Sequence, residues 1–294
     1  MYPDYLIHIN GKGYVTLYGI CIGVGVLLAF LLFWWLAKKG KVDEKYVDFT
    51  SINLLISTAF GFFCAGFFPA MGELVKTGKF EFGTLSFVAG AVGGAVLFFI
   101  IGIAFRKKHK GSLLDVISIA ACCLVLAHGI GRMGCFFAGC CHGQVTDSVW
   151  GVVFHNYGSE PRIPTQLFEV VFDLILCFFM AVLYIREKFE YNMSLWMIGY
   201  GSFRFLIEHL RDEPTRMFIA EGFSVTMLVC ILLVVGGVAY YFIMSPFVKR
   251  RKAYLLAYPN GEPAEKPAES DAKTNDTLSD EVKPDAVPDI DEEK

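Results

Sequence analysis

Long apolar runs recur along the whole chain, separated by short polar segments. A membrane-spanning helix needs about 20 predominantly apolar residues. The chain is 55% hydrophobic and only 19% charged, and its mean hydropathy is +0.50. We therefore predict an all-α membrane protein with seven transmembrane helices, in residues 15–37, 47–69, 84–105, 113–135, 164–185, 193–210 and 221–245.

Basic residues follow every odd-numbered run, and loops rich in Lys and Arg stay in the cytoplasm. We therefore predict that the N-terminus lies outside and the C-terminus lies in the cytoplasm. The basic residues behind this prediction are Lys38, Lys39, Lys41, Lys45, Arg106, Lys107, Lys108, Lys110, Arg186, Lys188, Lys249, Arg250, Arg251 and Lys252.

The C-terminal end differs from the rest of the chain in charge. From Asn260 onward there are 12 acidic residues against 4 lysines, and apolar periodicity is absent. Such a composition is typical of a disordered segment. We predict a transmembrane domain in residues 1–252 and an acidic, disordered cytoplasmic tail in residues 253–294.

Within the short sixth run, polar side chains fall on one stripe. Tyr200, Arg204, Glu208 and Arg211 have offsets of 0, 4, 8 and 11 residues. At about 100° per residue they lie within an arc of about 80° on a helix. Ionisable groups inside a membrane helix are costly, so they usually mark a site or a pathway.

The fifth run has a similar stripe at its outer end. Arg162, Gln166, Glu169 and Asp173 have offsets of 0, 4, 7 and 11 residues. The two stripes should meet near the outer leaflet. A purely structural ion pair between them, for instance Arg204 with Glu169, is an alternative to a functional site.

A glycine-rich segment, 131–143, is predicted as a turn at the outer end of the fourth run. Arg132 could hold a phosphate by paired hydrogen bonds, or it could be an arginine that reaches the interface. His128 is four residues earlier, on the same helix face, and could be a base or a hydrogen-bonded core residue.

The same segment contains Cys135, Cys140, Cys141 and His142. Their spacing does not match common zinc patterns. A metal site, a disulfide in an external compartment, and small packing or site-lining residues all remain open.

Several boxes in this order resemble the bacterial prolipoprotein diacylglyceryl transferases. The segments 162–169 and 200–211 match the family's R-x-P-x-Q-L-Y/F-E and Y-x-x-x-R-x-x-x-E-x-x-R boxes. The Tyr18-Gly19 pair, the glycine-rich stretch 88–94 and the segment 131–143 match more loosely. Where the family has histidine, two asparagines and glutamate, this chain has Val88, Cys135, Ala138 and Cys140.

The resemblance implies a multi-pass enzyme of the bacterial cytoplasmic (inner) membrane. Such an enzyme transfers the diacylglyceryl group of phosphatidylglycerol to the lipobox cysteine thiol of a prolipoprotein signal peptide and releases glycerol phosphate. The partners implied are these two substrates and membrane lipid, without nucleic acid, and the cofactors implied are none, organic or metal.

By resemblance and geometry, Arg132 and Arg204 are expected to bind the lipid phosphate. Glu208 would orient Arg204 or take the thiol proton, and His128 and His142 are other candidates for the base. The expected substrate-binding residues are Tyr18, Tyr200, Arg211, Arg162, Gln166, Glu169, Gly134, Gly139, Cys135, Cys140 and His142.

Two rival functions remain open at the level of sequence. One is a phospholipid-binding or transport protein that lacks the transfer chemistry. The other is a membrane redox or metal protein that uses Cys135, Cys140 and Cys141.

Overall fold

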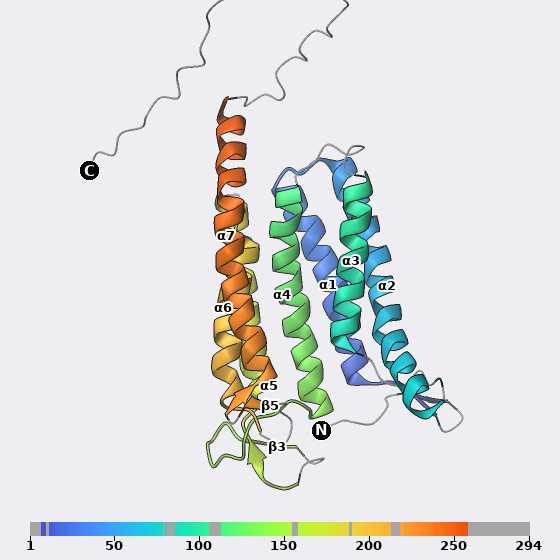
Figure 1. Cartoon of the computed structure of the whole chain (residues 1–294). Coiled ribbons are helices and arrows are strands. Elements are labelled where there is room, and N and C mark those ends of the chain that lie inside the picture. The colour runs from blue at the N-terminus through green and yellow to red at the C-terminus, as the bar shows by residue number, and fades with distance from the viewer. Residues whose placement is uncertain are drawn as a thin grey trace, which may run out of the picture. The chain divides into compact units, whose positions relative to one another are not determined.

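The structure of the chain is a computed structural model, shown in Figure 1. Contacts divide the chain into two units, Met1–Val248 and Lys249–Lys294. The fold and site lie in the first unit, and the described part of the second is the end of the last helix. The described residues are 7–9, 12–78, 80, 86–105, 113–154, 158–187, 190–212, 218–220 and 222–257.

Seven α-helices occur in the described residues, one for each predicted apolar run. They are α1 (Leu17–Lys39), α2 (Glu44–Thr77), α3 (Phe87–Phe105), α4 (Leu113–Ala138), α5 (Thr165–Glu187), α6 (Asn192–Glu208) and α7 (Val225–Ala257).

Five of these helices are long and apolar enough to cross a membrane: α1, α2, α4, α5 and α7. The apolar part of α3, Ala89–Phe105, is shorter, and α6 has 17 residues. The helical membrane fold is thereby confirmed. Seven crossings and the orientation of the termini stay predictions. The acidic tail from residue 258 onward lies outside the described residues.

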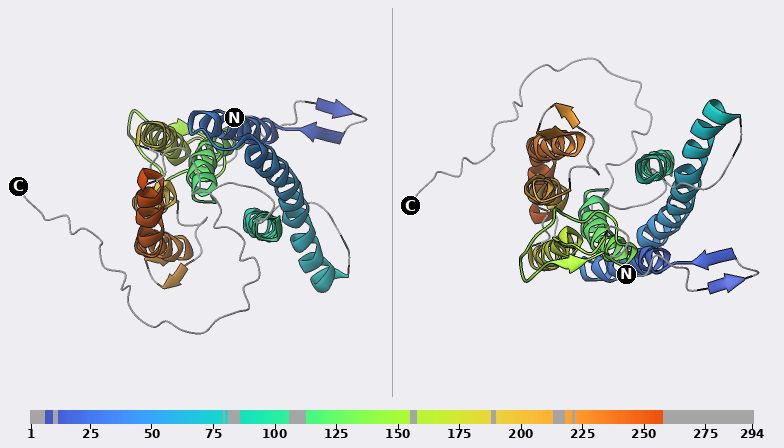
Figure 2. Two further views of the ribbon diagram at one scale, coloured as in Figure 1. Left: turned by 90° about the horizontal axis from the view of Figure 1, so that it is seen from above. Right: turned by 90° about the horizontal axis from the view of Figure 1, so that it is seen from below.

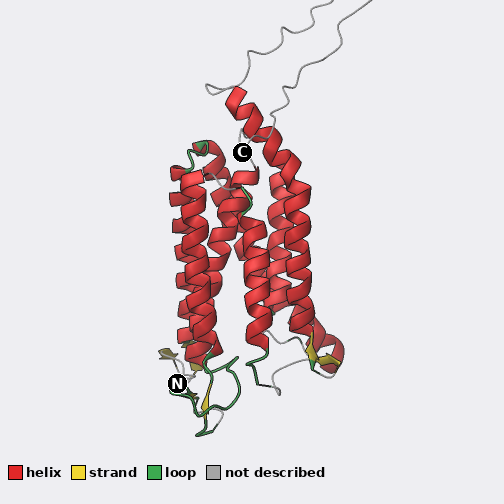
Figure 3. Ribbon diagram, turned by 90° about the vertical axis from the view of Figure 1, so that its left-hand side faces the viewer, coloured by secondary structure: helices red, strands yellow, loops and turns green. Residues whose placement is uncertain are grey.

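Three short antiparallel hairpins accompany the helices: one precedes α1, one lies between α4 and α5, and one lies between α6 and α7. They pair β1 (Ile7–Ile9) with β2 (Lys12–Val15), β3 (Val152–Val153) with β4 (Pro161–Arg162), and β5 (Phe218–Ala220) with β6 (Phe223–Ser224). Figure 3 shows these strands in yellow at one end of the helices, where α4 also ends. Polar chain segments therefore gather at this end.

Helix α4 lies at the centre of the packing. It contacts α1, α5 and α6, whereas α2 packs mainly with α3, as Figure 2 shows from above and below. The buried core between these helices includes Phe33, Ile119, Val125, Met180 and Tyr184. Many large apolar side chains elsewhere are exposed, as expected for surfaces that face lipid.

Buried polar contacts join α6 to its neighbours. The Asn192 side-chain amide donates to the carbonyl oxygens of Met180 on α5 at 3.2 Å and Ser118 on α4 at 3.5 Å. The Ser194 hydroxyl donates to the carbonyl oxygen of Gly237 on α7 at 2.7 Å. Since apolar lipid offers no alternative partners, such bonds fix how α6 sits between α4, α5 and α7.

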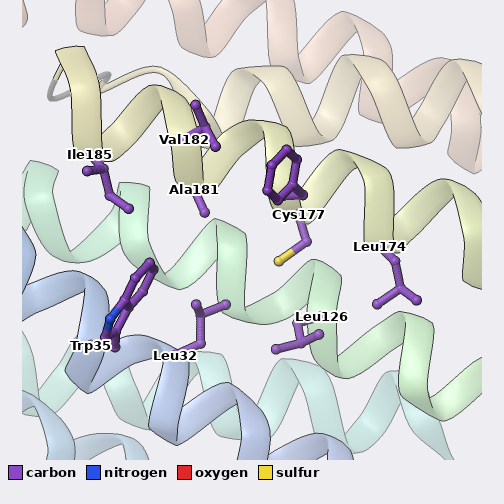
Figure 4. A pocket seen from close by; sticks show the side chains of 9 residues that line it. Leu32, Trp35, Leu126, Leu174, Cys177, Ala181, Val182 and Ile185 are labelled. Atoms are coloured by element: carbon purple, nitrogen blue, oxygen red, sulfur yellow. The ribbon is translucent and has the colours of Figure 1, made fainter.

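Two apolar pockets lie on the helix surfaces. One, shown in Figure 4, is formed by α1, α4 and α5, with Leu32, Trp35, Leu126, Cys177 and Ile185 among its lining residues. The other lies between α6 and α7 and is lined by residues from the segments 201–206 and 230–235. Among the described residues, no charged side chain lines either pocket.

Candidate functional site

A network of backbone bonds brings three chain segments together at the end of α4. The Gly143 amide donates to the Ile163 carbonyl at 2.8 Å, and the Gln144 amide donates to the Leu210 carbonyl at 2.9 Å. Val145 forms an isolated bridge with Arg162. The loop after α4, the entry to α5 and the exit from α6 are thus held as one platform, which aligns the polar ends of these helices.

Side chains at the start of α5 secure the turn after α4. The Thr165 hydroxyl donates to the Cys141 carbonyl at 2.9 Å, and the Gln166 amide donates to the Cys140 carbonyl at 2.6 Å. These bonds satisfy two carbonyl groups of the turn that follows α4. Gln166 therefore contacts the turn.

Below this platform, one carboxylate joins two guanidinium groups from different helices. Glu169 of α5 lies 2.8 Å (Oε2) from Arg132 Nε on α4 and 3.8 Å (Oε1) from Arg204 Nη1 on α6. The side chain of Glu169 is 1% exposed, that of Arg204 is 5% exposed and that of Arg132 is 15% exposed. The structural pairing considered from the sequence, Arg204 with Glu169, is present, and Arg132 shares it.

Glu208 completes what we call the ionic centre, formed by Arg132, Glu169, Arg204 and Glu208. Its Oε2 lies 2.9 Å from Arg204 Nη2, one helical turn earlier, and its Oε1 accepts from the Ser224 hydroxyl at 2.9 Å. The two carboxylates balance the two guanidinium groups, so the formal charge of the centre is zero. Such balance is what low-dielectric surroundings demand.

Not every polar atom of the ionic centre is satisfied. In the part of the chain that the structure describes, Arg204 Nη1 is buried and makes no hydrogen bond, because Glu169 is too distant for one. The Oε1 atom of Gln166 is buried and likewise makes none. Buried polar groups usually find partners, so a buried guanidinium donor without one is a candidate contact for a ligand.

A second polar group lies beside the ionic centre. Nδ1 of His128 is 2.7 Å from Oδ2 of Asp173, and Nε2 of His128 is 3.3 Å from the Tyr200 hydroxyl. The Asp173 side chain is 1% exposed and that of His128 is 24% exposed. Because Asp173 accepts the Nδ1 proton, Nε2 carries the lone pair and can accept a proton. Tyr200 is also close enough to Arg132 for the two to interact electrostatically, which connects the two groups.

Three sequence-based expectations about local structure are wrong. The segment 131–138 continues α4, so only 139–143 forms a turn. Arg162 belongs to β4 and pairs with Asp212, so it is not on the α5 stripe. Arg211 lies beyond the end of α6 and bridges Gly143. In each case backbone pairing at the platform decides where a helix begins or ends.

The turn after α4 has the hydrogen bonds of a Schellman cap. The Cys140 amide donates to the Cys135 carbonyl and the Gly139 amide to the Phe136 carbonyl, both at 3.1 Å. Gly139 has φ 71°, which glycine adopts at no steric cost. Cys141 also has a positive φ, 64°. This cap returns the chain over the last turn of α4.

The cap gathers three thiols, Cys135, Cys140 and Cys141, which we call the thiol cluster. Hydrogen bonds with Cys135 and Cys140 lower the pKa of Cys141, and Arg211 and Arg132 add to this effect. Hydrogen bonds with Cys135 and Cys141 raise the pKa of Cys140. All nine cysteines of the chain carry free thiols.

The remaining predicted residues lie at the edges of the site. Tyr18 is 39% exposed on α1 and packs closely against Gly134, where an added Cβ would meet its ring at 3.1 Å. His142 is fully buried, with Nδ1 3.1 Å from the Gly143 carbonyl and its ring against Phe154. It is therefore poorly placed to exchange protons with a substrate.

Sequence reasoning did not include Asp173, Ser224 or Asp212 among the site residues. Asp173 lies on the α5 stripe, four residues after Glu169, but the sequence does not show that it pairs with His128. Ser224 and Asp212 give no signal of their own in the sequence, because their partners become neighbours only through the fold.

The fold and site define a multi-pass membrane protein with an ionic centre at one end of its central helix. The family model for prolipoprotein diacylglyceryl transferase matches residues 4–243. The chain belongs to this family, which confirms the resemblance seen in its motifs.

Curated relatives agree with this assignment. Phosphatidylglycerol--prolipoprotein diacylglyceryl transferase 2 of Clostridium perfringens is 30% identical over 233 residues, 76% of this chain and 89% of that protein. The corresponding transferase of Clostridium tetani is 31% identical over 67% of this chain and 81% of its own length. That of Actinobacillus pleuropneumoniae (serotype 3) is 30% identical over 79% of this chain and 90% of its own length.

The shared role of Glu169 leads to a prediction about stability. Glu169→Gln should destabilise the protein by about 3–5 kcal/mol, because it leaves two buried guanidinium groups without their common carboxylate. Thermal unfolding of detergent-purified protein measures this effect. The control is Glu187→Gln, an exposed carboxylate at the end of the same helix, which should change stability by less than about 0.5 kcal/mol. Equal, small shifts for both variants would contradict a structural role for the shared ion pair.

Proposed function

We propose that this chain transfers the diacylglyceryl group of phosphatidylglycerol to the cysteine thiol of a prolipoprotein. The thiol sulfur attacks the glyceryl carbon next to the phosphate ester and forms a thioether. The carbon–oxygen bond breaks, its electron pair goes to the phosphate oxygen, and glycerol phosphate leaves. Family membership supports this reaction, and the observation that carries it to this chain is the pair of guanidinium groups in the ionic centre.

The leaving phosphate needs fixed positive charge, and preorganised charge usually makes the largest contribution to catalysis. We assign this role to Arg132 and Arg204. Glu169 holds both guanidinium groups in place, and Glu208 with Ser224 fixes Arg204 from the other side. The resting centre is neutral, so an arriving phosphate would bring negative charge beside Arg204 Nη1, a buried donor that makes no hydrogen bond within the described residues.

The substrate thiol has an ordinary pKa of about 8.5 and must lose its proton to attack. Of the three candidate bases, we assign this role to Nε2 of His128. Asp173 holds the imidazole with Nε2 as the acceptor, and the ring is partly exposed. His142 is buried against its own backbone, and Glu208 is already bound by Arg204 and Ser224.

The substrate-binding residues follow from the same assignment. We propose that Tyr18 and Tyr200 donate hydrogen bonds to the lipid head group and that Arg211 lies at its outer mouth. Arg162, paired with Asp212, and Gln166, bonded to the turn, keep this mouth in shape. Gly134 lets Tyr18 approach α4, and Gly139 lets the turn form. Cys135, in the last turn of α4, and Cys140, in the turn that follows, would line the same side. The fully buried His142, packed against Phe154, would hold the turn in place without touching the lipid.

We also propose that all seven helices cross the cytoplasmic (inner) membrane of a bacterium. The N-terminus lies outside and the C-terminus in the cytoplasm, because the basic loops follow the odd-numbered helices. The platform and ionic centre then lie at the outer side, where the signal peptide of an exported preprotein arrives.

Removing either guanidinium group should stop the transfer. Arg132→Gln and Arg204→Gln should each lower kcat by at least about 100-fold, the usual effect of losing one preorganised donor. The assay follows thioether formation on a lipobox peptide with phosphatidylglycerol vesicles. Arg186→Gln, at the exposed end of α5, should keep wild-type turnover. A wild-type protein that binds phosphatidylglycerol without any transfer would instead support a lipid-binding protein.

The role of His128 predicts which variant loses the reaction. His128→Gln should lower kcat by about 100-fold or more, because it removes the proton acceptor for the substrate thiol. His209→Gln, an exposed histidine at the end of α6, should leave kcat unchanged. Both rates are measured with the same lipobox peptide and phosphatidylglycerol vesicles. Undiminished turnover in His128→Gln would show that another group is the base.

The proposed orientation predicts which loops proteases can reach. In spheroplasts, an epitope inserted after Ser148, in the exposed loop that follows α4, should be cleaved from outside. An epitope inserted after Gly40, between α1 and α2, should be protected until the membrane is opened. The reverse pattern of cleavage would show that the orientation is the opposite of the proposed one and that the site does not lie on the outer side.

A further inference from the structure

The thiols of Cys135, Cys140 and Cys141 make and break no bond in the transfer reaction proposed above, although Cys135 and Cys140 lie beside the proposed lipid mouth. The sulfur atoms of Cys135, Cys140 and Cys141 all lie within 4.8 Å of one another. All three side chains are partly exposed, whereas most of the other six cysteines are buried in helix packing. The cluster is therefore both convergent and reachable.

The three thiols converge because of the local backbone conformation at the end of α4. In a Schellman cap, the residue three positions before the helix end and the residue two positions after it come into contact. Here these residues are Cys135 and Cys140, joined by the 3.1 Å backbone bond. Cys141, the next residue after Cys140, has a positive φ. This backbone turn keeps the Cys141 sulfur close to the other two.

We propose that the thiol cluster is a binding site for one soft metal ion with filled d orbitals, with Cu⁺ the best fit. Sulfur ligands lie about 2.3 Å from such ions, so three sulfurs around a three-coordinate ion are about 4.0 Å apart. The observed limit of 4.8 Å requires only a small contraction.

The number and type of ligands favour Cu⁺ over Zn²⁺. Thiolates select soft ions, and structural Zn²⁺ almost always has four protein ligands. Among the described residues, no fourth Cys, His, Asp or Glu atom joins the group of three. Cu⁺ is satisfied by three sulfurs, whereas Zn²⁺ would need a water molecule as its fourth ligand.

The surrounding charges also suit a metal–thiolate complex. Three thiolates with Cu⁺ carry two negative charges, and the guanidinium groups of Arg132 and Arg211 are close enough to act on these sulfurs. Each thiol gives up its proton to the solvent when the metal binds, so binding weakens at low pH. The metal takes no part in the proposed transfer reaction, and its occupancy can be measured without any activity assay.

The test is a metal titration of the full-length protein in lipid nanodiscs, without oxygen and with a phosphine reductant. The probes are Cu⁺ and Zn²⁺, each supplied with a competing chromogenic chelator. We expect one Cu⁺ per chain, and an X-ray absorption spectrum with three sulfur neighbours at about 2.3 Å. Zn²⁺ should bind at least about tenfold more weakly in its competition series, because a protein ligand is missing.

The matched variants are Cys135→Ser, Cys140→Ser and Cys141→Ser, with Cys21→Ser as the control. Each of the first three should lower Cu⁺ affinity at least about tenfold, the smallest loss seen even for residues that only support ligands. Cys21 is a partly exposed thiol of α1 outside the cluster, and its variant should bind like wild type.

Three results would overturn the proposal. They are full Cu⁺ binding after all three cluster thiols are changed, an equal loss in Cys21→Ser, and a spectrum of wild-type protein without three sulfur neighbours. The spectrum needs no variant, so a cluster variant that fails to fold does not remove the test.

Discussion

The buried carboxylate of Glu169 is the contact on which the site depends. Arg132, Glu169 and Arg204 come from α4, α5 and α6, and burying any one of these charges without the others would be energetically costly. Their mutual pairing therefore sets how the three helices approach one another. It also places two guanidinium groups in one location, which a single helix could not do.

The backbone platform above this contact has a different physical basis. Strand-like bonds among the segments after α4, before α5 and after α6 hold the helix ends together. Side chains of α5 then satisfy the carbonyl groups of the turn after α4. The ion pairs can stay buried because the platform and the apolar core around α4 keep their helices in register.

The ionic centre is neutral overall, yet it still has a donor available for an anionic ligand. Two guanidinium groups alone would be too costly to bury, and two with every donor already bonded would offer little to a phosphate. The ionic centre lies between these limits, because Arg204 Nη1 makes no hydrogen bond in the described part of the chain. Glu208 is poorly suited to act as a base, because Arg204 and Ser224 already bind it. His128 is better suited, because Asp173 binds its Nδ1 and only the Tyr200 hydroxyl, at 3.3 Å, contacts its Nε2 among the described residues.

The sequence by itself determined the seven helices, because long apolar runs have one stable conformation in lipid. The sequence also determined most of the polar residues of the site, since charges in such runs must face one another. Its two specific boxes determined the family. Only the tertiary structure decided that Glu169 is shared, that His128 pairs with Asp173 45 residues away, and that α4 continues to Ala138. Only the structure gathered the three thiols, because a helix cap set by backbone hydrogen bonds brings them together. The periodicity of polar residues shows which face of its own helix a side chain occupies. Its partners on other helices, and the residues at which helices end, depend on contacts that form only when the chain is folded.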